Sequence, residues 1–171
     1  PHFSNSWIPD YNKLTNNTKL LTNSAKFLSD ADDEYEYRKQ VDVDKFLEEY
    51  GNDLSNLRQI WITGGEPLYH SKHYDFLERC LPEAHHITLQ YNSNFSKLDY
   101  NGKSILDLWA KFKKVSVRVS LDAYPDIYDY VRVRGHLPTA EKNIKSALRL
   151  RNMNLSATCT ASLLNVTRLP Q

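Results

Sequence analysis

Short apolar runs alternate along the chain with longer segments whose apolar positions follow a helical period. Four of the runs are rich in β-branched or aromatic residues, and each ends at a polar or glycine-containing turn. Those features are typical of β-strands. We therefore predict strands over residues 59–63, 86–91, 115–121 and 155–161.

Four other segments carry apolar residues three and four positions apart, the spacing that places them on one helix face. Gly51 suits the C-cap of the first helix, while Ser71 is a reasonable N-cap for the second and Pro82 closes it. The fourth is entered through Pro138-Thr139. The predicted helices lie around residues 43–50, 74–81, 105–112 and 144–151.

Strands separated by helices indicate β–α crossovers, and hence a parallel sheet in an α/β fold. Several of the strands also carry polar residues at alternate positions, which predicts that one face of the sheet lines a wet interior. An open sheet and a partial barrel both agree with this pattern.

Composition narrows the classes of function. The 171 residues suit one domain, and 40% hydrophobic with 25% charged residues is an ordinary globular composition. A formal net charge of +1 gives no basic field for nucleic acid, and no apolar stretch approaches the roughly 20 residues of a membrane span. Cys80 and Cys159 belong to no C-x-x-C pair, so we expect two buried free thiols in a reducing cytoplasm.

The residues that follow the first predicted strand, Gly64-Gly65-Glu66-Pro67, suggest a binding turn. Glycines allow positive φ and let backbone carbonyls approach a ligand, Glu66 adds an anion beside them, and Pro67 stiffens the turn. Ligands of parallel α/β folds bind at this end of the strands. The combination suits a cation such as a protonated amine, and a tight turn with nothing bound is the alternative.

Gly64-Gly65-Glu66-Pro67 resembles the GGEP motif of radical S-adenosylmethionine (radical SAM) enzymes, whose glycine carbonyls and glutamate hold the amino group of the cofactor's methionine part. Further segments resemble the family's polar Thr-Asn turn, its Ser-x-Asp stretch, its Tyr-Ile-Arg segment and its Asn-Val pair, in the family's order. In this chain they lie at residues 91–94, 120–122, 130–132 and 165–166. The resemblance covers most of the chain, from residue 1 to about 166.

The resemblance implies a partial (β/α)6-type TIM-like barrel of parallel strands that binds S-adenosylmethionine (SAM). Glu66 and the Gly64 and Gly65 carbonyls would then hold the ammonium group. The carboxylate would meet Arg132, with Arg134 as the alternative, because a guanidinium binds a carboxylate with two parallel hydrogen bonds. The remaining cofactor-binding candidates, beside Pro67, would face the ribose and methionine: Asn92, Asn94, Ser120 and Asp122. A turn or N-cap role is the alternative for Asp122.

Residues 1–7 resemble the segment just after the cysteine loop in the family's SPASM or twitch subgroup. The three loop cysteines that hold a [4Fe–4S] cluster are not in this sequence, and neither Cys80 nor Cys159 replaces them. Because both ends stop within a pattern, we expect residues 1–171 to be part of one core domain. The first strand and cysteine loop would lie upstream, and the last strands and any extension downstream.

The function implied by the resemblance is that of an enzyme that binds SAM beside a [4Fe–4S] cluster. With an electron donor as partner, it would generate a 5′-deoxyadenosyl radical that abstracts hydrogen from a peptide, protein or small-molecule substrate. We expect the fragment itself to be inactive for lack of the cysteines. The alternative is a non-catalytic α/β module that binds a ligand or peptide without a cluster.

Other titratable residues are interpreted as structural. His70 and His73 lie three positions apart on a predicted helix without a third metal ligand, which predicts surface residues. His85 and His86 precede a strand, so they should lie at its amino end, away from the glycine turn. The acidic segment at residues 30–37 is interpreted as a solvated loop.

Overall fold

The computed structural model describes residues 54–63, 65–123, 127–132 and 135–168, which all belong to one compact unit, Leu54–Gln171. The predicted helix at 43–50 and the segments at 1–7 and 30–37 lie outside the described residues. Within the described ranges, no helix is both long and apolar enough to cross a membrane.

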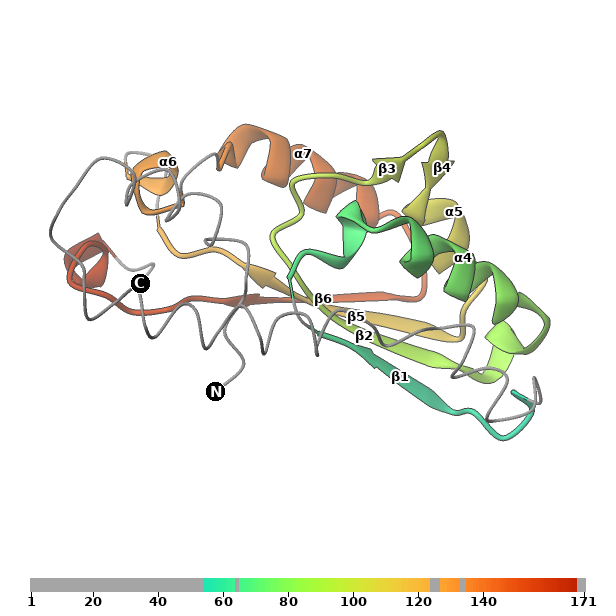
Figure 1. Ribbon diagram of the computed structural model, residues 1–171. Helices are drawn as coiled ribbons and strands as arrows, with labels where there is room; N and C mark the ends of the chain where they lie inside the picture. The colour runs from blue at the N-terminus through green and yellow to red at the C-terminus, as the bar shows by residue number, and fades with distance from the viewer. Residues whose placement is uncertain (1–53, 64, 124–126, 133–134, 169–171) are drawn as a thin grey trace, which may run out of the picture. The chain divides into compact units, whose positions relative to one another are not determined.

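A parallel sheet forms the centre of this unit (Figure 1). Its strand order is β1-β2-β5-β6, and every neighbouring pair is parallel. The α/β fold and the parallel sheet are therefore confirmed. The described strands form an open sheet, and its closure into a barrel stays a prediction. The strands are β1 (Gln59–Ile62), β2 (Thr88–Ser93), β5 (Lys114–Ser120) and β6 (Met153–Thr158).

All four predicted strands exist, but β2 begins and ends two residues later than predicted, and β6 begins two residues and ends three residues earlier. His86 does not begin β2, because the 3-10 helix η3 (Leu81–His86), with Pro82 in its first turn, occupies this stretch. Cys159 lies just beyond the end of β6 and not within the strand. The 3-10 helix sets the first of these boundaries, and strand propensity does not report it.

Three helices cover one face of the sheet: α4 (Ser71–Arg79), α5 (Ile105–Trp109) and α7 (Leu137–Ala147) (Figure 1). Pro138 lies in the first turn of α7, where a missing N–H costs no hydrogen bond. The prediction that Ser71 caps α4 is wrong. The N-cap is His70, whose side chain makes no capping bond, because the 3-10 helix η2 (Pro67–Tyr69) leads directly into α4.

Residues of the sheet alternate between a buried face and an open face. On β5, Val115, Val117 and Val119 are buried beneath the helices, whereas Ser116 and Arg118 point to the other side. The predicted alternation of polar residues is therefore confirmed. It leaves one face of the sheet free of the three helices that bury the other.

A short hairpin connects β2 to α5. Its strands are β3 (Asp99–Tyr100) and β4 (Lys103–Ser104), which pair antiparallel. Asn101 and Gly102 form the turn, and both have positive φ (49° and 78°). An Asn-Gly pair with this backbone is a common two-residue hairpin turn. The dipeptide could have revealed the hairpin, which the sequence analysis missed.

His73 belongs to the core of the fold, and the prediction of a surface residue is wrong. Its side chain is buried, and its Nε2 lies 2.9 Å from the hydroxyl of Tyr91. Tyr74 and Tyr91 pack against its ring edge to face. Burial lowers the pKa of His73 to about 4, because charging the imidazole would remove a cation from water.

The buried His73 should make folding stability depend on acidity. An unfolded histidine takes up a proton near pH 6.5, while the folded one stays neutral until about pH 4. The free energy of unfolding is therefore expected to fall as the pH drops from 6.5 to 4, by about 3 kcal/mol from this residue. Urea unfolding at several pH values measures it. The stability advantage of the wild type over His73→Gln should shrink across this window, and a constant advantage would contradict the assignment.

Candidate functional site

The carboxyl ends of the four parallel strands bring together residues that are far apart in the sequence. The turn containing Glu66 follows β1, Asn94 follows β2, Asp122 follows β5, and Thr160 follows β6. Parallel strands in one sheet end at the same edge. Glu66, Asn94 and Asp122 therefore lie at this edge of the sheet.

Glu66 connects the first two strands through its carboxylate. It is the N-cap of η2, and its Oε1 accepts a hydrogen bond from the backbone N–H of Leu68 (3.4 Å). The same oxygen accepts one from the Ser93 hydroxyl (2.8 Å), and Oε2 accepts one from the backbone N–H of Asn94 (2.7 Å). Glu66 thus fixes the glycine turn against the end of β2.

The environment of Glu66 suits a cationic ligand. Burial raises the pKa of this carboxyl, although its three hydrogen bonds and the charge of Arg132 act in the opposite direction. Within the described ranges no lysine or arginine forms an ion pair with it. An ionised carboxylate offers about four acceptor positions, so at least one is open to another donor.

Ser93 is a site residue that the sequence analysis missed between Asn92 and Asn94. Its hydroxyl donates to Glu66 and accepts from the backbone N–H of Phe95 (3.0 Å), and its side chain is 2% exposed. The alternation of β2 places it on the buried face with Leu89. A serine at such a position needs hydrogen-bond partners, and this was the available signal.

The turn after β2 is held in an uncommon conformation. Phe95 has φ of 54° although it is not glycine, and its side chain is fully buried. The side-chain amide of Asn143 on α7 donates to its carbonyl (2.7 Å), and Asn94 Oδ1 accepts from the N–H of Ser96 (2.9 Å). Left-handed backbone at a bulky residue costs energy and tends to occur at functional sites. In this turn Asn94 donates its backbone N–H to Glu66, and its side-chain oxygen accepts from the N–H of Ser96.

Asp122 and Arg132 form an ion pair at the same edge. Asp122 Oδ2 lies 2.6 Å from Arg132 Nη2, and Asp122 Oδ1 accepts from the N–H of Thr160 (2.9 Å). Asp122 thus connects β5 to the residues after β6. It is not the N-cap of the short helix α6 (Tyr128–Val131), a position that Ile127 takes.

Arg132 keeps one donor free next to this ion pair. Its Nε is buried and has no hydrogen-bond partner among the residues described. The N–H of Gly135 donates to the Arg132 carbonyl (2.6 Å), and a Cβ on Gly135 would lie 2.8 Å from that oxygen. Glycine is therefore required for this close turn. A buried, unpartnered guanidinium N–H is suited to an incoming carboxylate.

The side chain of Asn165 stabilises the carboxyl edge of the sheet through hydrogen bonds. Its side chain is fully buried and donates to the carbonyls of Asp122 and Thr160, the latter at 2.8 Å. Its Oδ1 accepts from the N–H of Ser162 (2.7 Å). The side chain thereby joins the segment after β5 to the segment after β6. The Asn-Val resemblance pointed to this residue but not to its structural role.

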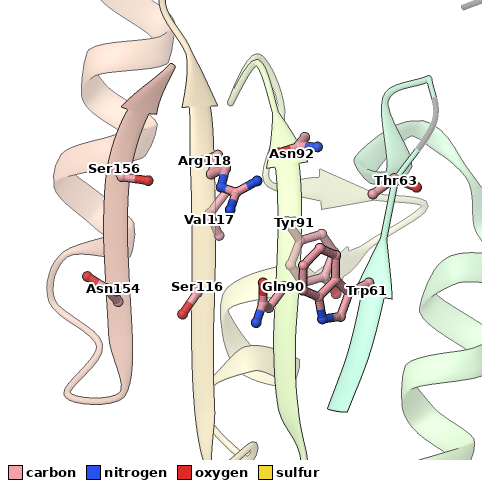
Figure 2. Close-up of a pocket in the computed structure, with 10 residues that line it drawn as sticks. All are labelled: Trp61, Thr63, Gln90, Tyr91, Asn92, Ser116, Val117, Arg118, Asn154 and Ser156. Carbon is pink, nitrogen blue, oxygen red and sulfur yellow. The ribbon is translucent and has the colours of Figure 1, made fainter. Parts of the chain in front are cut away.

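Other predicted residues are placed less centrally. Gly65 does not use the positive φ that glycine allows, and a Cβ there would meet no atom within 4 Å. Asn92 lies on the open face of the sheet and not beside Glu66 (Figure 2). Ser120 is half-buried at the end of β5. Gly64 and Arg134 lie outside the described residues.

The two cysteines do not fit an iron–sulfur cluster. Both are free, but only Cys80 is buried, and the prediction that Cys159 is also buried is wrong, because it follows β6 on an exposed loop. Burial raises the pKa of the Cys80 thiol to about 11, so it stays protonated at neutral pH. Cluster iron is held by thiolates, usually four. Two separated cysteines, one of them a buried thiol, do not provide this set.

Glu83, His85 and His86 form the group with metal-ligand spacing in the described part of the chain, with their ligand atoms within 4.8 Å of one another. They lie in η3, before the amino end of β2. The two histidines are thus at the end of the strand opposite to the glycine turn, where the sequence predicted them.

Comparison with known proteins gives one match, which covers most of the chain. A family model described as the Radical SAM superfamily matches residues 22–167. No curated protein and no solved structure matches the chain.

Proposed function

Because this chain belongs to the radical SAM superfamily, we propose that it binds S-adenosylmethionine at the carboxyl edge of its sheet. The observation that carries the proposal is the half-buried Glu66 carboxylate at this edge, which has no lysine or arginine ion-pair partner in the described ranges. When bound, SAM would supply radical chemistry that abstracts hydrogen from a peptide or small-molecule substrate.

The ammonium group of SAM is proposed to bind Glu66. This carboxylate is already held rigidly by Ser93 and Asn94, so an ammonium would meet an acceptor in a fixed position. The raised pKa of Glu66 reflects desolvation without full compensation, and a bound cation would supply that compensation. The open space at Gly65 leaves room for the ligand beside its carbonyl.

The methionine carboxylate is proposed to bind Arg132 through the unpartnered Nε–H. Asp122 holds the guanidinium from the other side and fixes its direction. Ser120, on the open face at the end of β5, and the Asn94 turn are proposed to lie near the ribose and methionine. Asn92 lies on the open face of β2, further from the carboxyl edge than the Asn94 turn. It is proposed as the cofactor contact that lies furthest from this edge.

No step through a [4Fe–4S] cluster is assigned to residues of this chain, since its cysteines do not fit one. The second candidate function is a non-catalytic module that binds a ligand or peptide without a cluster. A C-x-x-x-C-x-x-C run directly before residue 1 in the gene would support the radical enzyme, and a start codon there would support the module. Anaerobic reconstitution of residues 1–171 with iron and sulfide should give no stoichiometric [4Fe–4S] absorbance under either candidate, and a full signal would contradict the conclusion that the two cysteines do not fit a cluster.

The binding proposal is tested by calorimetry with SAM and with 5′-methylthioadenosine. The second ligand keeps the adenosine part but lacks the amino and carboxylate groups. We expect SAM to bind about tenfold more tightly or better, because only SAM can reach both Glu66 and Arg132. Equal affinities, or no SAM binding, would contradict a site built on these two residues.

A further inference from the structure

The open face of the sheet contains a polar groove that the proposed cofactor site does not use fully. It has a cavity volume of about 290 Å³. Two rows of side chains cross its floor, because the strand register aligns Asn92 with Arg118 and Ser156, and Gln90 with Ser116 and Asn154. Figure 2 shows the two rows side by side on β2, β5 and β6.

Arg118 is the charged residue of this lining. It is exposed, and among the residues that the structure describes no carboxylate forms an ion pair with it. Its neighbours across the rows carry amides and hydroxyls, which can donate hydrogen bonds but do not neutralise a cation. The groove is therefore a positively charged concave surface with several neutral donors around one guanidinium.

The charge and shape favour a carboxylate over a phosphate. A guanidinium matches a carboxylate with two parallel hydrogen bonds, and one positive charge balances one negative charge. A phosphate dianion would keep a charge that the amides of Asn92 and Asn154 cannot balance. The volume lies near the lower end of the range for ligand pockets, so the groove suits a small acid or one acidic side chain.

Trp61 gives the groove an apolar wall. It lies on β1 in register with Gln90, and its side chain is 61% exposed. A large exposed indole beside a polar floor offers contact area to the apolar part of a ligand. The groove therefore combines a site for a carboxylate with a site for a hydrocarbon or aromatic body.

The groove lies next to the edge where the cofactor is proposed to bind. Arg118 precedes Ser120 by two residues on β5, which corresponds to about 7 Å along a strand. We propose that this groove binds the substrate of the radical reaction, that the substrate carries a carboxylate, and that Arg118 recognises this group. The identification of the ligand as the substrate rests on the proposed function, whereas the carboxylate site can be tested independently of it.

The test uses two carboxylate probes and their neutral amides. 3-Phenylpropionate represents a small acid, and N-acetylglutamate N-methylamide represents an acidic side chain in a peptide. Binding is followed by the shift of the Trp61 indole N–H in nuclear magnetic resonance spectra, assigned with Trp61→Phe. We expect at least one acid to bind about tenfold more tightly than its amide, and the acid that binds better identifies the source of the carboxylate.

Arg118→Gln should remove this preference and weaken the acid about tenfold or more, while Arg149→Gln, an exposed arginine after α7, should leave it unchanged. Equal binding of acids and amides, no binding of either acid, displacement by equimolar phosphate, or an unaffected Arg118→Gln variant would each overturn the proposal. A lower melting temperature of Arg118→Gln without ligand would also overturn it, since Arg118 would then serve an internal ion pair.

Affinity for SAM separates this inference from the proposed function. Arg118→Gln should bind SAM as the wild type does, because its role is assigned to the substrate. If SAM binds and the acids do not, the groove inference fails alone. If the acids bind through Arg118 and SAM does not, the carboxylate site stands and the proposed function fails.

Discussion

Glu66→Gln is expected to raise the dissociation constant for SAM about 10- to 100-fold. The carboxylate is proposed to accept a hydrogen bond from the ammonium group, and a hydrogen bond between charged groups contributes about 1.5–3 kcal/mol. Calorimetry with SAM measures the change. 5′-Methylthioadenosine, which has no amino group, should bind the variant and the wild type equally.

Glutamine is suited to this test because it can keep the contacts that hold the turn. Its carbonyl oxygen can take the place of Oε2 and accept from the N–H of Asn94, and its amide can donate to the Ser93 hydroxyl in the place of Oε1. The Ser93 hydroxyl can serve as donor or acceptor. Only the weak contact with Leu68, at 3.4 Å, would then meet a donor. The substitution therefore removes the charge and largely keeps the shape.

The same substitution should leave the unliganded protein as stable as before, or more stable. Burial raises the pKa of Glu66 in the folded state, so the folded protein binds this proton more readily than the unfolded chain. Stability from this residue is therefore fully present below pH 4.5 and falls as the pH rises through the raised pKa of the folded state. The melting temperature of Glu66→Gln at pH 7 should be equal to or above that of the wild type, with the difference vanishing near pH 4.

Glu141→Gln is the matched control, because Glu141 is exposed on α7. It should change neither the SAM affinity nor the melting temperature. An unchanged SAM affinity in Glu66→Gln would remove Glu66 from the site. An equal loss for SAM and 5′-methylthioadenosine would show that Glu66 shapes the turn and does not hold the ammonium group.

The sheet could be predicted from the sequence because burial imposes a visible pattern on each strand. Val115, Val117 and Val119 must face the helices, so they alternate with polar residues that face the open side. The parallel order then follows from the helices between the strands, and it brings the strand ends together. The approximate place of Glu66, Asp122 and Arg132 was therefore predictable without any knowledge of their contacts.

The contacts themselves were not predictable, because they join residues that no local pattern connects. Ser93 meets Glu66 across 27 positions and Asn143 meets Phe95 across 48. His73 looked like a surface histidine because its helical spacing reports only which residues share a face. His73 can be buried because its Nε2 forms a hydrogen bond with the hydroxyl of Tyr91 on β2. The burial and the long-range contacts of such residues can be determined only from the tertiary structure.

Asn165→Asp is expected to destabilise the fold by about 3 kcal/mol at pH 7 to 8. The change replaces the Asn165 amide donor by an oxygen that faces the carbonyls of Asp122 and Thr160 in a fully buried position. Two acceptors lose their donor, and a charge would have to be buried without a partner. Urea unfolding with linear extrapolation measures the loss.

The acidity dependence of this loss identifies its cause. A buried carboxyl without a cation takes up a proton more readily when folded, and the protonated form can donate one hydrogen bond again. The stability deficit of Asn165→Asp should therefore be smaller at pH 5 than at pH 8. Asn101→Asp, in the exposed hairpin turn where aspartate tolerates positive φ, is the control and should show almost no deficit at either pH.

The same variant should also weaken SAM binding, although Asn165 is not proposed to touch the ligand. Its amide holds the segment after β6 in the place from which Thr160 donates to Asp122, and Asp122 in turn holds Arg132. Loss of the amide would release this chain of contacts, so Arg132 would meet the carboxylate of SAM less often. A variant that remains folded at pH 5, loses stability at pH 8 and yet binds SAM with unchanged affinity at both would show that Arg132 is positioned independently of Asn165.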